Sequence, residues 1–231
     1  MNKLITILLS LFASLGLYAQ DFNLPCDNLD YKESVMTVLL YADGNQNKEP
    51  LIPLDNPTQR LTLSFDLLGS DGKVLNYTFF HCTNDWYLTD IQRTTYVNGF
   101  DYGLVDDYDF SRNTLVDYVH YHLSFPEEEM TPVISGNYLL VVYEEDLAEE
   151  HVYFTRRFMV LDNKAGISAS VPRYCDDLSL SDTHQQLNLE VTMPSIMTGN
   201  VQQYANLTIR QNGRWDNAVM MLGMVTSRFN C

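Results

Sequence analysis

The stretch that decides the fold is residues 115–125, LVDYVHYHLSF, in which apolar side chains recur at every second position. In an extended strand successive side chains point to opposite faces. One face then carries Leu115, Val119, Tyr121, Leu123 and Phe125, and the other carries Val116, Tyr118, His120 and His122. The first set is typical of a core face. The second set is amphipathic and aromatic, which leaves room for a partner.

Five further stretches have the same character, being rich in Val, Thr, Tyr, Phe and Leu and bounded by turn-forming pairs such as Asp43-Gly44 and Asn98-Gly99. They are residues 34–42, 59–68, 73–83, 136–145 and 151–162. Hardly any stretch keeps a helical period. The sequence therefore predicts an all-β protein, with an immunoglobulin-like antiparallel β-sandwich over residues 20–165.

The composition changes after Asp162. Residues 163–172, NKAGISASVP, are small and polar and are typical of a linker, and three more strand-like stretches follow at 185–193, 202–212 and 214–221. Three strands leave unpaired edges and cannot close a sandwich. We therefore expect residues 166–231 to be a linker and a truncated second β-domain.

The N-terminus is typical of a secretory signal peptide, with Lys3, an apolar run from Leu4 to Leu17 and Ala19 at the expected cleavage site. The sequence predicts that residues 1–19 are a signal peptide and that the protein is exported. An oxidising compartment permits disulfides. The four cysteines, Cys26, Cys82, Cys175 and Cys231, allow three pairings that the sequence does not decide, and Cys82 is most simply interpreted as a buried free thiol.

Charge excludes some classes of partner. The 231 residues carry 14 basic and 30 acidic side chains, for a net charge of −16. Such a field repels phosphate, so nucleic acid and anionic membrane surfaces are not expected partners. Oligomeric state is left open by the sequence.

Two groups of polar residues are candidate functional sites. His120 and His122 point the same way on a strand, but no third metal ligand is identifiable, so no metal is predicted. Asp101, Asp106, Asp107 and Asp109 are expected in a loop beside Tyr102 and Tyr108, and carboxylates beside aromatic residues are typical of glycoside hydrolases. No phosphate loop, nucleophile elbow or zinc-protease motif occurs. We predict no catalytic residue and no cofactor.

The middle of the chain resembles the plug-protein family of the type IX secretion system. Five motifs carry this resemblance over about residues 30–165: His81-Cys82 with Trp86; Tyr96 with Asn98-Gly99-Phe100; Ser111, Asn113 and Thr114 with Tyr118, His120 and Tyr121; Ser135-Gly136-Asn137-Tyr138 with Tyr143; and Thr155-Arg156-Arg157-Phe158. Residues 211–216, QNGRWD, resemble the start of the family's second domain. The motif residues other than Trp86 are expected to be structural.

The resemblance implies a non-catalytic periplasmic component that plugs the periplasmic opening of the outer-membrane translocon barrel. Aromatic side chains dominate protein interfaces, so we expect Trp86 and Tyr102 among the contacts. Two alternatives stay open. A secreted glycan-binding sandwich would stack sugars on Trp86, Tyr87 and Tyr102, and an all-β glycoside hydrolase would place two carboxylates across a cleft.

Overall fold

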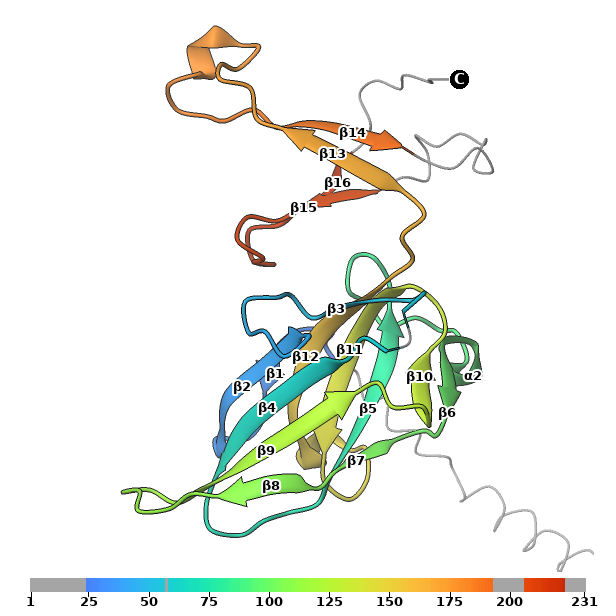
Figure 1. Ribbon diagram of the computed structural model, residues 1–231, viewed down its shortest axis with the longest axis vertical. Coiled ribbons are helices and arrows are strands. Elements are labelled where there is room, and N and C mark those ends of the chain that lie inside the picture. Colours follow the sequence, from blue (N-terminus) through green and yellow to red (C-terminus); the bar gives the residue numbers. More distant parts are fainter. Residues whose placement is uncertain (1–23, 57, 193–205, 223–231) are drawn as a thin grey trace, which may run out of the picture.

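Two β-sheets pack face to face in the computed structural model, which describes residues 24–56, 58–192 and 206–222 (Figure 1). The larger sheet has six strands in the order β1-β12-β11-β5-β7, and β3 pairs the C-terminal part of β12. Its pairings are antiparallel except that between β3 and β12, which is parallel. The strands are β1 (Leu29–Asp30), β3 (Leu51–Pro53), β5 (Leu75–Cys82), β7 (Gly103–Val105), β11 (Gly136–Tyr143) and β12 (Val152–Leu161).

The second sheet is wholly antiparallel, in the order β2-β4-β9-β8. Its strands are β2 (Val35–Ala42), β4 (Leu61–Leu68), β8 (Asp107–Phe110) and β9 (Tyr118–Phe125). All six long strands that the sequence predicts in the sandwich are present, and the prediction of an all-β sandwich is confirmed.

Alternation in β9 sets its face toward the other sheet. Val119, Tyr121, Leu123 and Phe125 are buried, as predicted. Leu115 is an exception, because β9 begins only at Tyr118 and the chain before it is a loop beyond the sheet, where Leu115 is fully exposed. The expectation that Leu115 belongs to the core face is therefore wrong.

Aromatic side chains join the two sheets. Phe65 of β4 stacks on Tyr121 of β9 with ring centroids 4.8 Å apart and meets Phe154 of β12 edge-on at the same distance. Phe125 of β9 contacts Phe158 of β12 at 5.5 Å. Such pairs add to the free energy gained by burying their area, so the core both fills and aligns the sandwich.

The outer face of the larger sheet is buried as well. A second hydrophobic cluster there contains Leu139 and Val141 of β11 and Cys82 of β5. Leu24 and Cys26 from the segment before β1 cover them, together with Trp86 from the loop after β5. This double burial explains why β11 is apolar at almost every position rather than alternating.

Small elements close the ends of the sandwich. A two-stranded ladder joins β6 to β10, a short helix precedes β6, and 3-10 turns lie before β12 and after β13. They are α2 (Arg93–Tyr96), β6 (Val97–Gly99), β10 (Met130–Pro132), η1 (Glu149–His151) and η2 (Leu178–Leu180). Gly99 is required in β6, because its φ is 105° and a Cβ there would lie 1.9 Å from the carbonyl oxygen of Glu129.

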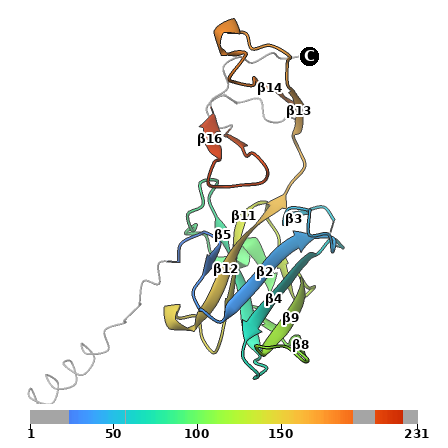
Figure 2. The same ribbon diagram turned by 90° about the vertical axis from the view of Figure 1, so that its left-hand side faces the viewer.

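The chain beyond the sandwich forms two hairpin-like sheets at one end of it (Figures 1 and 2). One pairs β13 (Gly166–Ser170) with β14 (Asn188–Thr192), and the other pairs β15 (Leu207–Ile209) with β16 (Val219–Leu222). The stretch interpreted as a linker thus contains a strand. All five residues of β13 are exposed, so the strand has no buried face to produce a recognisable pattern.

Part of the sequence interpretation lies outside the described residues. The signal peptide of residues 1–19 and Cys231 fall there, as do parts of the predicted strands at 185–193 and 202–212. Among the residues the structure does describe, no helix has the length and apolar character needed to cross a membrane.

Candidate partner-binding surface

An exposed apolar segment runs along the free edge of the larger sheet, from Phe100 to Leu104. Phe100, Tyr102 and Leu104 are 62%, 53% and 50% exposed. The last of them lies in β7, opposite Asn76 of β5. Apolar residues at every second position, preceded by Gly99, are a strand-like signal, yet only Tyr102 among them is predicted as a partner contact.

Polar contacts, some of them part-buried, hold this edge segment in place. The Arg93 guanidinium donates to the carbonyl oxygen of Phe79 at 2.9 Å and to that of Phe100 at 3.3 Å, and its Nε lies 3.2 Å from a carboxylate oxygen of Asp101. Thr78 Oγ1 donates to the carbonyl of Asp101 at 2.7 Å. These contacts fix the backbone on both sides of position 101. The aromatic side chains are therefore presented from a rigid edge, which reduces the entropy cost of binding. Nothing in the sequence pattern singles out Arg93.

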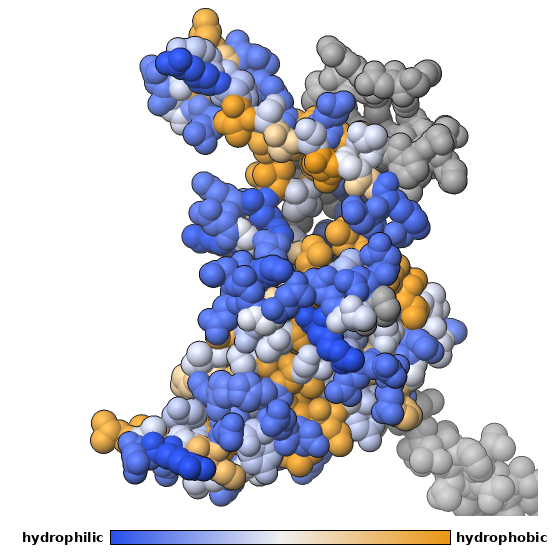
Figure 3. Space-filling model, in the orientation of Figure 1, coloured by the Kyte–Doolittle hydropathy of each residue, from blue (hydrophilic) through white to orange (hydrophobic). Residues whose placement is uncertain are grey.

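A second exposed apolar group lies at the tip of the β8–β9 hairpin. Phe110, Leu115 and Val116 are 54%, 105% and 61% exposed. Figure 3 shows hydrophobic residues projecting at this end of the molecule, at the lower left. The loop is shaped by Ser111, whose N–H and Oγ both bond the backbone of Tyr118 at 2.9 Å.

Trp86 does not lie on an exposed face. It is 5% exposed, its ring lies 4.5 Å from the Arg157 guanidinium carbon, and Trp215 meets it edge-on at 4.8 Å. The expectation that it contacts a partner directly is therefore not supported. Arg157 and Trp215 come from distant parts of the sequence, so the local pattern around Trp86 could not reveal this cover.

Because Trp86 is buried, the predicted glycan-binding platform lacks its central aromatic ring. Tyr87 is 69% exposed and Tyr102 is 53% exposed, but Trp86 offers no ring face to a sugar. We find no geometry that favours the glycan-binding alternative over a protein-binding surface.

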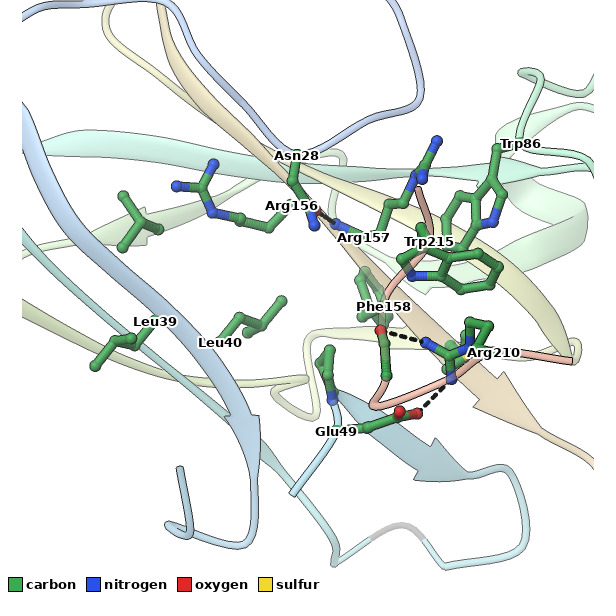
Figure 4. A pocket seen from close by; sticks show the side chains of 14 residues that line it. Asn28, Leu39, Leu40, Glu49, Trp86, Arg156, Arg157, Phe158, Arg210 and Trp215 are labelled. Atoms are coloured by element: carbon green, nitrogen blue, oxygen red, sulfur yellow. Dashed lines mark hydrogen bonds and ion pairs between the residues drawn. The ribbon is translucent and has the colours of Figure 1, made fainter. Parts of the chain in front are cut away.

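A cavity of about 290 Å³ lies where the C-terminal hairpin meets the sandwich (Figure 4). Its cations are Arg156, Arg157 and Arg210, which would attract an anion in an otherwise acidic chain. Each already has a carboxylate partner: Asp30 at 2.7 Å, Asp27 at 3.3 Å and Glu49, respectively. Burial lowers the pKa of Arg157, and the charge of Asp27 opposes that shift. The cavity is best described as the contact between the two parts of the chain.

Most of the motif residues take part in packing or in hydrogen bonds within the sandwich. His81 lies between Tyr96 and Tyr138, with ring centroids at 5.9 and 5.2 Å, and burial lowers its pKa. The Tyr138 hydroxyl donates to the carbonyl of Ile134 at 2.8 Å, and Asn137 donates to that of Thr83 at 3.0 Å. Phe158 and Tyr121 are buried in the core.

Tight backbone positions account for others. A Cβ at Gly136 would lie 2.4 Å from Nε2 of His81, and Asn113 has a φ of 57° in the loop before β9. Thr114 and Ser135 are exposed. Phe100 differs from the rest because it belongs to the exposed edge segment.

The histidine pair and the aspartates singled out in the sequence do not come together as a catalytic or metal site. His120 contacts Asp66 through Nδ1 at 2.5 Å, and its ring lies 4.3 Å from that of His122. No cluster of three His, Cys, Asp or Glu side chains suited to a metal ion occurs in the described part of the chain.

The hydrolase alternative also loses its geometry. Asp107 and Asp109 lie on strand β8, not in the loop we expected, and they pair in register with His122 and His120 on the outer face of the smaller sheet. They therefore share one strand rather than facing each other across a cleft.

Together these features define an all-β sandwich module whose exposed apolar edges, rather than a cleft, are available for contact. Residues 35–162 match the model of the family described as type 9 secretion system plug protein 1st domain. The chain belongs to this family. Members of the family are non-catalytic components of the type IX secretion machinery, and this membership suggests a periplasmic or envelope location. No curated protein matches the chain.

A solved structure supports the fold beyond the family match. The crystal structure of a hypothetical protein from Parabacteroides merdae ATCC 43184 is similar with a TM-score of 0.80 and 28% identity, over 89% of this chain and 51% of that one. The chain thus spans about half the length of that relative. A further match, alkylpurine DNA glycosylase AlkC of Pseudomonas fluorescens bound to DNA containing an abasic site analog, has a TM-score of 0.29 and 11% identity over 55% of this chain and 30% of that one, and carries no argument.

Proposed function

We propose that this protein is exported, resides in the periplasm and plugs the periplasmic opening of the outer-membrane translocon barrel of the type IX system. The match of residues 35–162 to the plug family carries the proposal. A plug must resist deformation, and the two-layer aromatic core together with the covered outer face of the larger sheet supplies that rigidity.

The contact surface proposed is the edge segment with Phe100, Tyr102 and Leu104. Its side chains are about half or more exposed on a backbone held by Arg93 and Thr78. Desolvating large aromatic side chains contributes most of the binding free energy in protein interfaces. Neutral contacts of this kind also suit a chain with a charge of −16, because they need no complementary basic patch.

Co-purification with the translocon barrel from outer-membrane extract tests this proposal. We expect the double variant F100A/Y102A to bind at least about 30-fold more weakly, since truncation of even one hot-spot aromatic side chain costs about 2 kcal/mol or more. The matched control is Tyr174→Ala, which removes an aromatic side chain that is 59% exposed but lies outside the sandwich.

Circular dichroism must show that both variants keep the fold of the unmodified protein. Wild-type protein that never co-purifies with an outer-membrane barrel would overturn the function. Retained binding by the folded F100A/Y102A variant would overturn the assigned surface alone.

A further inference from the structure

Two cysteines meet under the cover of the larger sheet. The Sγ atoms of Cys26 and Cys82 lie 3.0 Å apart, and the two residues are 6% and 1% exposed. Cys82 ends β5, and Cys26 belongs to the segment before β1. The pair therefore joins positions 56 residues apart in the chain.

The backbone on both sides of the pair is fixed independently of the sulfur atoms. Arg157 donates through Nε to the carbonyl oxygen of Cys26 at 2.6 Å, and its backbone N–H donates to Asn28 Oδ1 at 2.7 Å. Leu29 pairs with Thr155 in the sheet, and Cys82 pairs with Asn137. The fold thus brings the two sulfur atoms together without relying on a bond between them.

The surroundings of the pair also change the pKa values of the two thiols in opposite directions. The contact with Cys82 and the charge of Arg157 lower the pKa of Cys26, whereas the same contact and burial raise the pKa of Cys82. In the docked state Cys26 is therefore the member that more readily forms a thiolate, the species that attacks disulfides.

We propose that Cys26 and Cys82 form a disulfide bond in the exported protein, which anchors the N-terminal segment over the outer face of the larger sheet. The oxidant is a disulfide-bearing thiol oxidase or exchange protein of the cell envelope. The thiolate of one cysteine attacks one sulfur of that disulfide and expels the other as a thiolate, and the thiolate of the second cysteine then attacks the first and releases the oxidant in its dithiol form. Two electrons pass to the oxidant, and the two thiol protons reach its sulfur atoms through solvent.

The order of events follows from burial. Both sulfur atoms are covered in the folded chain, so exchange takes place before the N-terminal segment docks on the sheet. The structure offers neither cysteine another partner among the described residues, since Cys175 lies beyond the sandwich, where its Sγ contacts the carbonyl of His184 at 3.4 Å. The proposal rests on the envelope location included in the proposed function, but not on binding to the translocon.

Peptide mapping of the full chain purified from the periplasm tests the bond directly. The protein is denatured and alkylated with iodoacetamide without reduction, then digested and analysed by mass spectrometry. We expect a linked peptide containing Cys26 and Cys82, which separates only after treatment with a reductant. Alkylated Cys26 and Cys82 in unreduced protein, or linkage of either one to Cys175 or Cys231, would overturn the proposal whether or not the protein binds a translocon.

Thermal unfolding provides the second readout. A bond closing a loop of this length restricts the unfolded chain, so reduction of the wild-type protein is expected to lower its Tm by about 10 °C. The variants C26S and C82S should show a similarly low Tm that reductant does not change further. C175S is the matched control and should keep the reductant-sensitive, high Tm. A wild-type Tm that reductant leaves unchanged would count against the bond even if the serine variants fail to fold.

Discussion

The guanidinium carbon of Arg157 lies 4.5 Å from the centre of the Trp86 ring, and the same side chain donates to the backbone of Cys26. Arg157 is on β12, Trp86 is in the loop after β5, and Cys26 precedes β1. One side chain thus connects three segments that are distant in sequence and that together cover the outer face of the larger sheet.

Replacing this side chain should destabilise the sandwich. We expect Arg157→Ala to lower the free energy of unfolding by about 2 to 3 kcal/mol, through loss of a buried charge-assisted hydrogen bond and a cation–π contact. Lys48→Ala, which removes an exposed surface cation paired with Asp43, should change it by less than about 0.5 kcal/mol. Urea denaturation of both variants measures the difference. Equal effects would show that Arg157 contributes only as a surface charge.

Comparing alanine substitutions at two glycines distinguishes the cost of backbone strain from the cost of a steric clash. Gly69 and Gly99 have φ values of 125° and 105°, but a Cβ at Gly69 meets nothing within 4 Å, whereas one at Gly99 would lie 1.9 Å from the Glu129 carbonyl oxygen. Gly69→Ala should cost about 1 to 2 kcal/mol of stability from strain. Gly99→Ala should cost at least about 2 kcal/mol more, because the β6–β10 ladder must separate. Similar midpoints for the two variants in urea would contradict this explanation.

Acid should weaken a contact between Glu144, Lys73 and Tyr153. The Lys73 ammonium lies 2.8 Å from Glu144 and lowers the pKa of that carboxyl below its ordinary value of 4.5. Because the folded-state pKa is lowered, the contribution of Glu144 is fully present above about pH 5 and is lost as pH falls through the folded-state value. The effect should be small, since both side chains are partly exposed.

The variant Glu144→Gln isolates this contribution. It should be less stable than the wild type near pH 7, and the two stabilities should approach each other as the pH falls below about 4.5. The exposed Glu33 provides the matched control, because Glu33→Gln should leave the pH profile of the wild type unchanged. A constant difference between Glu144→Gln and the wild type from pH 7 to pH 3 would contradict the ionic origin.

Trp215 should protect the connection between the sandwich and the C-terminal strands. Its ring contacts Trp86 and lies 4.2 Å from the Arg210 guanidinium carbon. The partly buried side chain also packs against the hydrophobic cluster on the outer face of the larger sheet. We expect Trp215→Ala to accelerate tryptic cleavage after the exposed Lys164, which precedes β13. Tyr174→Ala, also in the C-terminal part, should leave the rate unchanged. Gel electrophoresis over time follows the cleavage, and an unchanged rate for Trp215→Ala would mean that its docking does not restrain the chain.

Sequence reasoning found the strands that bury one or both faces, because burial imposes an apolar pattern. It missed β7 and β8, since exposed Asp101, Asp107 and Asp109 made them resemble a loop. It also missed β13, which buries no residue. Short ladders such as β6–β10 are too brief to show a period.

The candidate surface was only partly predictable for a different reason. Tyr102 and Trp86 have similar local sequences, each being an aromatic residue among polar neighbours. Tyr102 is nevertheless 53% exposed and Trp86 only 5%. The difference is set by cover from Arg157 and Trp215, and no local pattern encodes a distant cover. The same limit applied to Cys82, whose proximity to Cys26 depends on where the N-terminal segment returns to the sheet.

The pairing of β1 with β12 has a consequence for how the chain acquires its structure. Leu29 lies opposite Thr155, so the first strand of the sandwich finds its neighbour only when the last strand is available. A polypeptide that emerges from a membrane pore with its N-terminus first must leave Leu29–Asp30 unpaired until more than 120 further residues have followed. Contacts between distant parts of a chain form slowly. In the proposed export, translocation and completion of the sandwich are therefore coupled in time, and the molecule stays open along its outer layer until β12 has crossed.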